Sequence, residues 1–127
     1  MPTPTAAESE LLRAAYAAFN ARDIPAALAL MTPDVAWPRA FKGGFVEGPA
    51  AVGAYWTEQW SEIDPHVEPI SLRRAEDGTI LVMVRQVVRD LAGALLADER
   101  VCHRFTLERG SIRKMEVCAP PSEPASA

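Results

Sequence analysis

The architecture of this chain follows from one segment, Val101-Cys102-His103-Arg104-Phe105-Thr106-Leu107-Glu108-Arg109-Gly110-Ser111-Ile112-Arg113-Lys114-Met115-Glu116-Val117-Cys118. Apolar and polar residues alternate before and after Glu108-Arg109-Gly110, which is the pattern of two half-buried strands. A glycine at the end of such a loop suits the left-handed position of a three-residue hairpin connection. The segment therefore predicts an antiparallel hairpin with strands over 98–107 and 111–118.

A three-residue loop also sets the register of this hairpin. It places Phe105 opposite Arg113 and His103 opposite Met115, and it makes Cys102 and Cys118 diagonal neighbours, too far apart for easy bridging. One face of the hairpin then carries mostly apolar residues: Val101, His103, Phe105, Leu107, Met115 and Val117. We interpret this face as the wall of a pocket. We expect His103, Phe105 and Met115 to point toward the helices, near Trp56 or Trp60.

Two more strands are predicted upstream, over 66–75 and 79–89, with the hairpin signal Asp77-Gly78 between them. The sequence does not decide which face of the second strand points toward the pocket. Loop geometry at 91–93 turns Leu81, Met83, Arg85 and Val87 toward the pocket, whereas Ile80, Val82, Val84 and Val88 form the more apolar face. A β-bulge would reconcile the two, and so would an outer face buried in a dimer. Because an exposed apolar sheet face is usually an interface, we expect a symmetric homodimer through the outer face.

The first half of the chain has helical periodicity instead. Apolar residues recur at spacings of three and four over 6–22, 24–31 and 49–62, which predicts three helices. Thr32-Pro33-Asp34 is interpreted as a turn, followed by a short strand over 34–38. The element order α-α-β-α-β-β-β-β predicts an α+β domain over 6–118. The Pro/Ala/Ser-rich residues 119–127 are expected to form a disordered tail.

Composition limits the functions that the chain can have. It has 127 residues, enough for one domain, and a net charge of −4, which argues against nucleic acid or an anionic membrane as the main partner. No apolar run reaches the ~18 residues of a membrane span, and the first residues do not resemble a signal peptide. Two cysteines are no disulfide framework, so a reducing cytoplasm is expected. No metal-ligand spacing or cofactor motif is present, so neither metal nor cofactor is expected.

Four strings of the sequence, taken in order, resemble the SnoaL-like branch of the nuclear transport factor two-like superfamily, the polyketide cyclase and ketosteroid isomerase relatives. They are Tyr16-Ala17-Ala18-Phe19-Asn20-Ala21-Arg22-Asp23, Asp34-Val35-Ala36-Trp37-Pro38, Glu47-Gly48-Pro49-Ala50-Ala51-Val52 and Phe105-Thr106-Leu107-Glu108-Arg109-Gly110-Ser111-Ile112. The resemblance covers about residues 8–118. It implies a cone-shaped sheet wrapped around three helices, with a pocket between them and dimers through the outer sheet face. The fold hosts many activities, so it does not specify one.

His103 is the candidate catalytic residue. A histidine titrates near neutrality and can act as a general acid or base. The resemblance aligns it with the pocket acid of ketosteroid isomerases. Its apolar neighbours should lower its pKa below the ordinary value of about 6.5. The alternative is a histidine hydrogen-bonded to a neighbour inside an enclosed sheet, with no chemical role.

Two arginines are candidates for orienting a ligand. The resemblance puts Arg39 where ketosteroid isomerases carry the proton-abstracting aspartate, and an arginine cannot serve as that base. Ala15 matches the isomerase tyrosine, with Tyr16 beside it, so steroid isomerisation is not expected. Arg39 is either a solvated loop charge or a contact for an anionic ligand. Arg85 either orients a ligand or forms a cross-strand ion pair with Glu99.

Aromatic side chains spaced for burial suggest a pocket for a flat apolar ligand, although they could also be plain core. The candidate ligand-binding residues are Tyr16, Phe19, Trp37, Arg39, Trp56, Trp60, Arg85, Phe105, Met115 and Val117. The leading hypothesis is a cofactor-independent enzyme of isomerase, cyclase or hydratase type, acting on a small hydrophobic carbonyl compound. The alternative is a non-catalytic ligand-binding or accessory protein that uses the same pocket.

Overall fold

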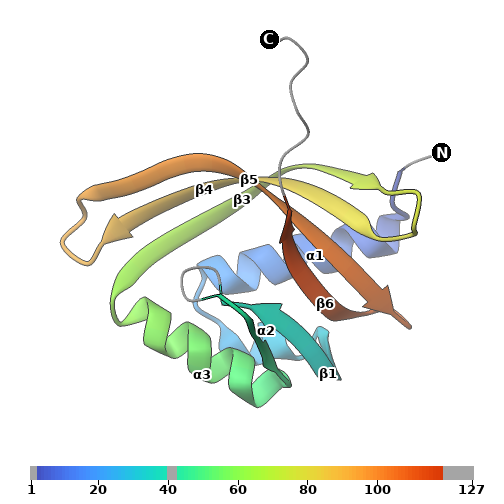
Figure 1. Ribbon diagram of the computed structural model, residues 1–127, viewed down its shortest axis with the longest axis horizontal. Helices are drawn as coiled ribbons and strands as arrows, with labels where there is room; N and C mark the ends of the chain where they lie inside the picture. The colour runs from blue at the N-terminus through green and yellow to red at the C-terminus, as the bar shows by residue number, and fades with distance from the viewer. Residues whose placement is uncertain (1–2, 40–42, 119–127) are drawn as a thin grey trace, which may run out of the picture.

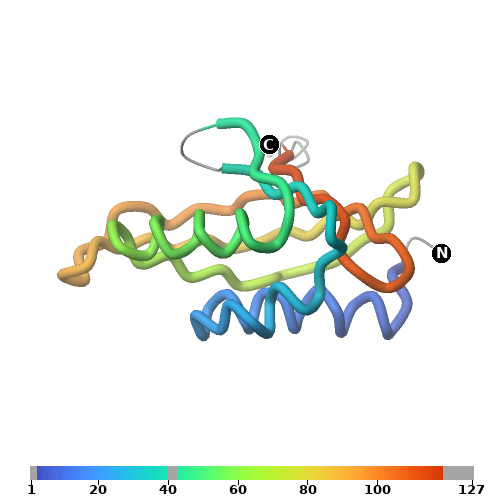
Figure 2. Tube along the Cα trace, turned by 90° about the horizontal axis from the view of Figure 1, so that it is seen from below, coloured from blue at the N-terminus to red at the C-terminus, as the bar shows by residue number. Residues whose placement is uncertain are grey.

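A curved, unclosed sheet arches over three helices in the computed structural model, which describes residues 3–39 and 43–118 (Figure 1). The helices are α1 (Ala6–Asn20), α2 (Ile24–Leu28) and α3 (Pro49–Trp60). The strands are β1 (Met31–Pro38), β2 (Phe45–Glu47), β3 (Ile63–Arg74), β4 (Ile80–Asp90), β5 (Leu95–Glu108) and β6 (Ser111–Cys118). They form one sheet in the order β2-β1-β6-β5-β4-β3. Both α1 and α3 run lengthwise along the molecule (Figure 2).

The predicted α+β fold is confirmed, and several local details differ. The strand β1 begins at Met31, so the expected turn at 32–34 is wrong: Ile112 N–H donates to Leu30 O at 2.8 Å and draws this segment alongside β6. The pairing of β1 with β6 is parallel, whereas the other strand pairs are antiparallel. The short strand β2 was not expected. The expected tail, 119–127, lies outside the described residues.

Helix α1 is fixed at both of its ends. Thr5 and Glu8 form a capping box at its start, which satisfies two backbone N–H groups that the helix leaves free. Glu8 also pairs with Arg74 at the end of β3. At the other end, the Asn20 amide donates to Val67 O at 2.6 Å and accepts from Val67 N–H at 2.9 Å. These contacts hold α1 against β3 along its length.

The register of the β5–β6 hairpin differs from the predicted one. Glu108 pairs with Ser111, so the loop has two residues, Arg109 and Gly110, with φ of +52° and +79°. Positive φ at both central residues is what a type I′ hairpin turn requires. The ladder then shifts next to Arg113, because Leu107 pairs with Ile112 but Thr106 pairs with Lys114.

The expected cross-strand partners are therefore wrong by two residues. His103 lies opposite Val117, and Phe105 lies opposite Met115. Because side chains alternate with a period of two, a shift of two leaves His103, Phe105, Met115 and Val117 on the same face. Cys102 and Cys118 are directly opposite rather than diagonal, and both are free thiols.

The more apolar face of β4 points toward the interior, and the other face points outward. Ile80, Val82 and Val84 are at most 1% exposed and pair with residues of the His103 face. Loop geometry at 91–93 gave the wrong face because the β4–β5 ladder has an irregularity: Val88 pairs with Ala97, but Arg89 pairs with Leu95. Such a bulge was one of the two ways to reconcile the patterns.

The core between α1 and the sheet gives a direct test of the fold. Leu12 of α1 is fully buried, whereas Leu91 at the end of β4 is 63% exposed. We expect Leu12→Ala to lower the free energy of unfolding by about 2–5 kcal/mol through lost apolar burial and a residual cavity. The matched change Leu91→Ala should alter it by no more than about 0.5 kcal/mol. Urea unfolding measures both, and equal effects would contradict this packing.

Candidate functional site

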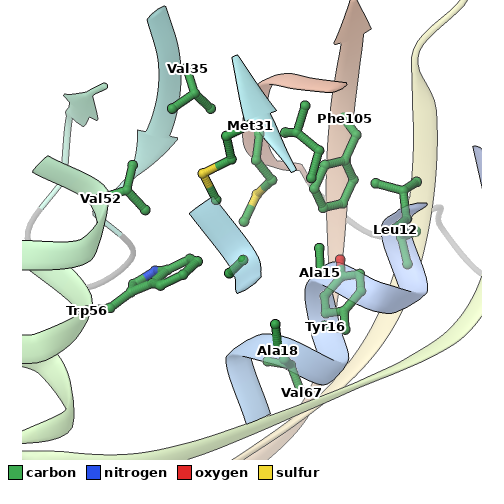
Figure 3. Packing of buried hydrophobic residues seen from close by; sticks show 14 of the residues in the cluster. Leu12, Ala15, Tyr16, Ala18, Met31, Val35, Val52, Trp56, Val67 and Phe105 are labelled. Atoms are coloured by element: carbon green, nitrogen blue, oxygen red, sulfur yellow. The ribbon is translucent and has the colours of Figure 1, made fainter. Parts of the chain in front are cut away.

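A cavity of about 250 Å³ lies between the helices and the inner face of the sheet. Figure 3 shows Tyr16 of α1 and Trp56 of α3 on two sides of this interior, with Phe105 of β5 above Tyr16. Apolar side chains dominate the wall, which favours an apolar ligand. The lining residues are Ala15, Tyr16, Phe19, Trp37, Pro38, Tyr55, Trp56, Gln59, Pro65, Val67, Gln86, Glu99, Val101, His103, Phe105, Met115 and Val117.

The aromatic rings of the wall form a continuous series of contacts. Phe19 meets Trp56 edge to face, with 5.2 Å between ring centroids, and Trp56 meets Trp37 in the same way at 5.3 Å. Trp37 then contacts Phe105, and Phe105 contacts Tyr16. Edge-to-face pairs are favourable geometries for such rings and leave other ring faces for a ligand. The wall is therefore both core and candidate binding surface.

A hydrogen bond between Tyr16 and His103 is the polar centre of this wall. Tyr16 Oη lies 2.7 Å from His103 Nδ1, and the two rings are within 5° of parallel. Both side chains are buried, at about 6% exposure. Helix α1 supplies one partner and strand β5 the other, so the contact depends on the tertiary fold.

Burial keeps both partners neutral around pH 7. It lowers the pKa of His103 from 6.5 to about 4, because the charged imidazolium is poorly solvated there. It raises the pKa of Tyr16 well above 10, and the charges of Cys102 and Cys118 add to this. A neutral tyrosine and a neutral histidine together hold two protons that can be donated, one O–H and one N–H.

The second ring nitrogen of His103, Nε2, has no hydrogen-bond partner among the described residues. Within residues 3–39 and 43–118, Tyr16 is the only hydrogen-bond partner of the His103 ring. Trp60 Nε1 is the only fully buried side-chain nitrogen or oxygen described that lacks a partner. His103 also lines the cavity, and its Nε2 has no hydrogen-bond partner in the described part of the chain.

Most of the predicted site residues meet at this cavity. Those that line it are Tyr16, Phe19, Trp37, Trp56, His103, Phe105, Met115 and Val117. His103, Phe105 and Met115 lie on the inner side of the sheet with Trp56, as the hairpin pattern predicts.

Three predicted residues lie elsewhere. Arg39 donates through Nε to Gly43 O at 2.9 Å, within its own loop. Trp60 packs behind the wall against Phe19 and Trp56. Arg85 is on the outer face, where Nε and Nη2 bind the Asp98 carboxylate at 3.0 and 2.7 Å.

Several polar lining residues were not predicted, namely Gln59, Gln86 and Glu99. Glu99 shares the face of His103 on β5, so the alternation could have identified it. Glu99 was instead assigned to a possible ion pair with Arg85, so it was not considered as a lining residue. That ion pair is wrong, because Glu99 lies opposite Gln86. Gln86 was missed because the facing of β4 was open.

The described residues contain no group of three or more His, Cys, Asp or Glu side chains arranged to hold a metal ion. No helix in the described ranges has the length and apolar character to cross a membrane.

Comparisons with known proteins agree with this fold. A family model described as a SnoaL-like domain matches residues 12–115. No curated protein sequence matches the chain significantly. Among solved structures, a nuclear transport factor two-like protein of unknown function from Burkholderia pseudomallei superposes with a TM-score of 0.77 at 24% identity, over 91% of this chain and 92% of that chain.

Two similar structures contain small molecules. TerC, co-crystallized with polyporic acid, superposes with a TM-score of 0.78 at 25% identity, over 91% of this chain and 92% of that chain. A Mycobacterium tuberculosis protein in complex with estradiol-17beta-hemisuccinate superposes with a TM-score of 0.76 at 17% identity, over 92% of this chain and 96% of that chain.

The buried His103 should make the stability of the protein depend on pH. Its pKa is about 4 in the folded chain and 6.5 when exposed, so the unfolded state binds the proton first as the pH falls. The stability that depends on neutral His103 is complete above pH 6.5, and about 3 kcal/mol of it is lost by pH 4. We expect His103→Gln to reduce the change in unfolding free energy between pH 7 and pH 4 by about this amount.

NMR titration provides the direct readout of this pKa. The ring signals of His103, assigned by their loss in His103→Gln, should stay constant from pH 8 to about pH 5. A midpoint near 6.5 would show that the imidazole is solvated and would contradict the buried geometry.

Proposed function

The chain belongs to the SnoaL-like family of the nuclear transport factor two-like superfamily, and on this basis we propose that it is a cofactor-independent enzyme that acts on a small hydrophobic carbonyl compound. The observation that carries the proposal is the buried Tyr16–His103 hydrogen bond at the wall of an apolar cavity. The reaction would be a proton transfer next to the carbonyl, the step that isomerases and cyclases share.

The wall supports a flat, apolar ligand. Aromatic rings from α1, β1, α3 and β5 surround the cavity, and rings bind flat molecules well by offset or edge contacts. Proteins of the same fold have been crystallised with polyporic acid and with estradiol-17beta-hemisuccinate, which supports a small molecule as the ligand of this chain. A cavity of about 250 Å³ suits a ligand of two or three fused rings at most.

The Tyr16–His103 pair has two neutral arrangements. In the first, Tyr16 O–H donates to Nδ1 and the proton on Nε2 can be given to a ligand. In the second, Nδ1–H donates to Tyr16 Oη, Nε2 is a free base, and Tyr16 O–H can be given to a ligand. Each arrangement offers a ligand carbonyl one proton donor.

Conversion of the second arrangement into the first would enolise a ketone. Nε2 takes a proton from the carbon beside the carbonyl, and Nδ1–H passes to Tyr16 Oη. The Tyr16 O–H proton reaches the carbonyl oxygen through one bridging water, because the two ring nitrogens of a histidine point in divergent directions. The ligand loses one C–H proton and gains one O–H proton, so the protons balance. No imidazolium forms, which suits a site that lowers the pKa of His103 to about 4. Return of the proton to a different carbon would complete an isomerisation.

The alternative function is binding without turnover. The loop position that the resemblance assigns to the isomerase base holds Arg39, which is bonded to Gly43 and does not line the cavity. Glu99 is the only carboxylate among the described lining residues, and it is solvent-exposed. If the Tyr16–His103 relay does not operate, the same cavity would act as a ligand carrier or accessory site.

Deuterium exchange separates the two functions. The probe is 2-acetonaphthone, a flat apolar methyl ketone, whose methyl protons exchange with D2O through the enol. We expect the protein to accelerate this exchange, measured by NMR, and we expect His103→Gln and Tyr16→Phe each to reduce the acceleration at least about 100-fold. Met115→Leu, a lining change without a titratable group, should leave it nearly intact.

Binding is followed by the fluorescence of Trp37 and Trp56, both in the cavity wall. The relay requires that the His103→Gln and Tyr16→Phe variants still bind the ketone. Binding by the unaltered protein with exchange no faster than in buffer would support the carrier function instead.

We also propose that two copies pair through the outer face of the sheet. With Val82 and Val84 facing inward, this face carries Leu81, Met83 and Val87 beside the Arg85–Asp98 ion pair. These side chains are only half-buried in a single chain, and a symmetric partner would cover them.

Light scattering at about 20 µM, well above a micromolar dissociation constant, should give the mass of a dimer. Met83→Arg should give the monomer, because it places a charge in the centre of the shared apolar strip. A monomeric unaltered protein at this concentration would rule out the dimer.

A further inference from the structure

A second cavity, of about 400 Å³, lies beside the turn end of the β4–β5 hairpin, between α3 and the strands. Figure 1 shows this hairpin extending over the end of α3 where the chain turns into β3. Its lining residues are Tyr55, Glu58, Gln59, Glu62, Ile63, Gln86, Val88, Leu96, Ala97 and Glu99. We call this space the outer chamber and the cavity beside His103 the inner chamber.

The two chambers are adjacent and share four polar lining residues, which we call the collar. Tyr55, Gln59, Gln86 and Glu99 line both of them. Gln86 and Glu99 are direct partners in the β4–β5 ladder, and Gln59 Nε2 donates to Tyr55 Oη at 3.2 Å, one helical turn away on α3. The collar is thus made of one pair on the sheet and one pair on the helix.

The irregularity in the β4–β5 ladder shapes the outer chamber. Leu96 is the extra residue between the Val88–Ala97 and Arg89–Leu95 pairs. A bulge brings neighbouring residues to one side of a strand, and Leu96 and Ala97 both line the outer chamber. Leu96 remains 56% exposed, so the chamber has an apolar rim that solvent reaches.

The charged residues of both chambers have one sign. Glu58, Glu62 and Glu99 are the only Asp, Glu, Lys or Arg residues that line either chamber in the described chain. A carboxylate near Glu62 and Glu99 would meet like charges, whereas an ammonium group there would meet opposite charges.

We propose that the outer chamber binds the tail of an elongated ligand whose carbonyl head lies against Tyr16 and His103. The tail passes the collar, contacts Leu96 and Ala97, and is uncharged or cationic at its end. This inference deepens the proposed function and rests on it for the position of the head.

The test uses 2-acetonaphthones that differ only at ring position 6: methoxy, butoxy, hexyloxy, and hexyloxy chains that end in an amine or a carboxylate. Affinity for the unaltered protein should rise from methoxy to hexyloxy, by up to about fourfold for each methylene that becomes buried. At low salt, the amine should bind at least tenfold more tightly than the carboxylate, and Glu62→Gln should narrow that ratio.

Ala97→Trp fills the outer chamber without touching the inner one. It should abolish the gain from methoxy to hexyloxy and leave the methoxy compound bound as before. Ala92→Trp, at the exposed hairpin turn outside both chambers, is the matched control and should change neither affinity. Leu96→Ser is a milder second variant, and it should weaken only the hexyloxy compound.

The outcomes distinguish this proposal from the function on which it rests. Binding of the methoxy compound with no gain from longer tails, or an equal gain in Ala97→Trp, would overturn the outer chamber and leave the proposed function intact. If the carboxylate-ended compound binds more tightly than the amine-ended one, the proposal that the tail end is uncharged or cationic is wrong. Failure of every acetonaphthone to bind would defeat the proposed function and this proposal with it.

Discussion

The hydrogen bond between Tyr16 and His103 joins residues 87 positions apart, and the interior is arranged around it. Each group is buried among apolar side chains, so loss of either would leave the other without a partner, at a cost of about 1–3 kcal/mol. The bond therefore ties α1 to β5 at one separation. The aromatic series from Phe105 through Trp37 and Trp56 closes the other side of the same space. A cavity survives because these rings meet at their edges instead of filling it.

A space lined by large apolar side chains would tend to collapse, and α1 is the element that could close it. The Glu8–Arg74 ion pair holds one end of that helix to β3, and the two hydrogen bonds between Asn20 and Val67 hold the other. These contacts are polar and directional, so they position α1 without placing side chains in the cavity. The same strand, β3, pairs with β4, and β4 contributes the inner face beside His103. The position of α1 and the shape of the pocket therefore both depend on the β3 edge of the sheet.

The fold class was predictable because alternation and helical period are local properties of the sequence. The face of the β5–β6 hairpin was predictable too, since a register error of two residues returns each side chain to the same side. Local pattern could not give the partners, because the irregularities next to Arg113 and at Leu96 arise from how strands meet in three dimensions. For the same reason, Arg85 was predicted to point toward the cavity, and Glu99 was not recognised as a lining residue. The hydrogen bond between Tyr16 and His103 could not be predicted, because no sequence pattern links a residue of a helix to a residue of such a distant strand.

The electrostatics of the interior restrict the chemistry that it can support. No arginine or lysine of the described chain lines the cavity, and the one charged group, Glu99, is negative. An enolate formed there would lack a counter-ion in an apolar environment, and a buried imidazolium is equally disfavoured because the pKa of His103 is about 4. A reaction in this cavity must therefore deliver a proton to oxygen as it removes one from carbon. A neutral tyrosine bonded to a neutral histidine can do both at once, whereas a lone carboxylate base would leave the charge uncompensated. The resemblance predicts a carboxylate base where this chain has Arg39, and a neutral proton-transfer pair is the alternative that this electrostatic constraint favours.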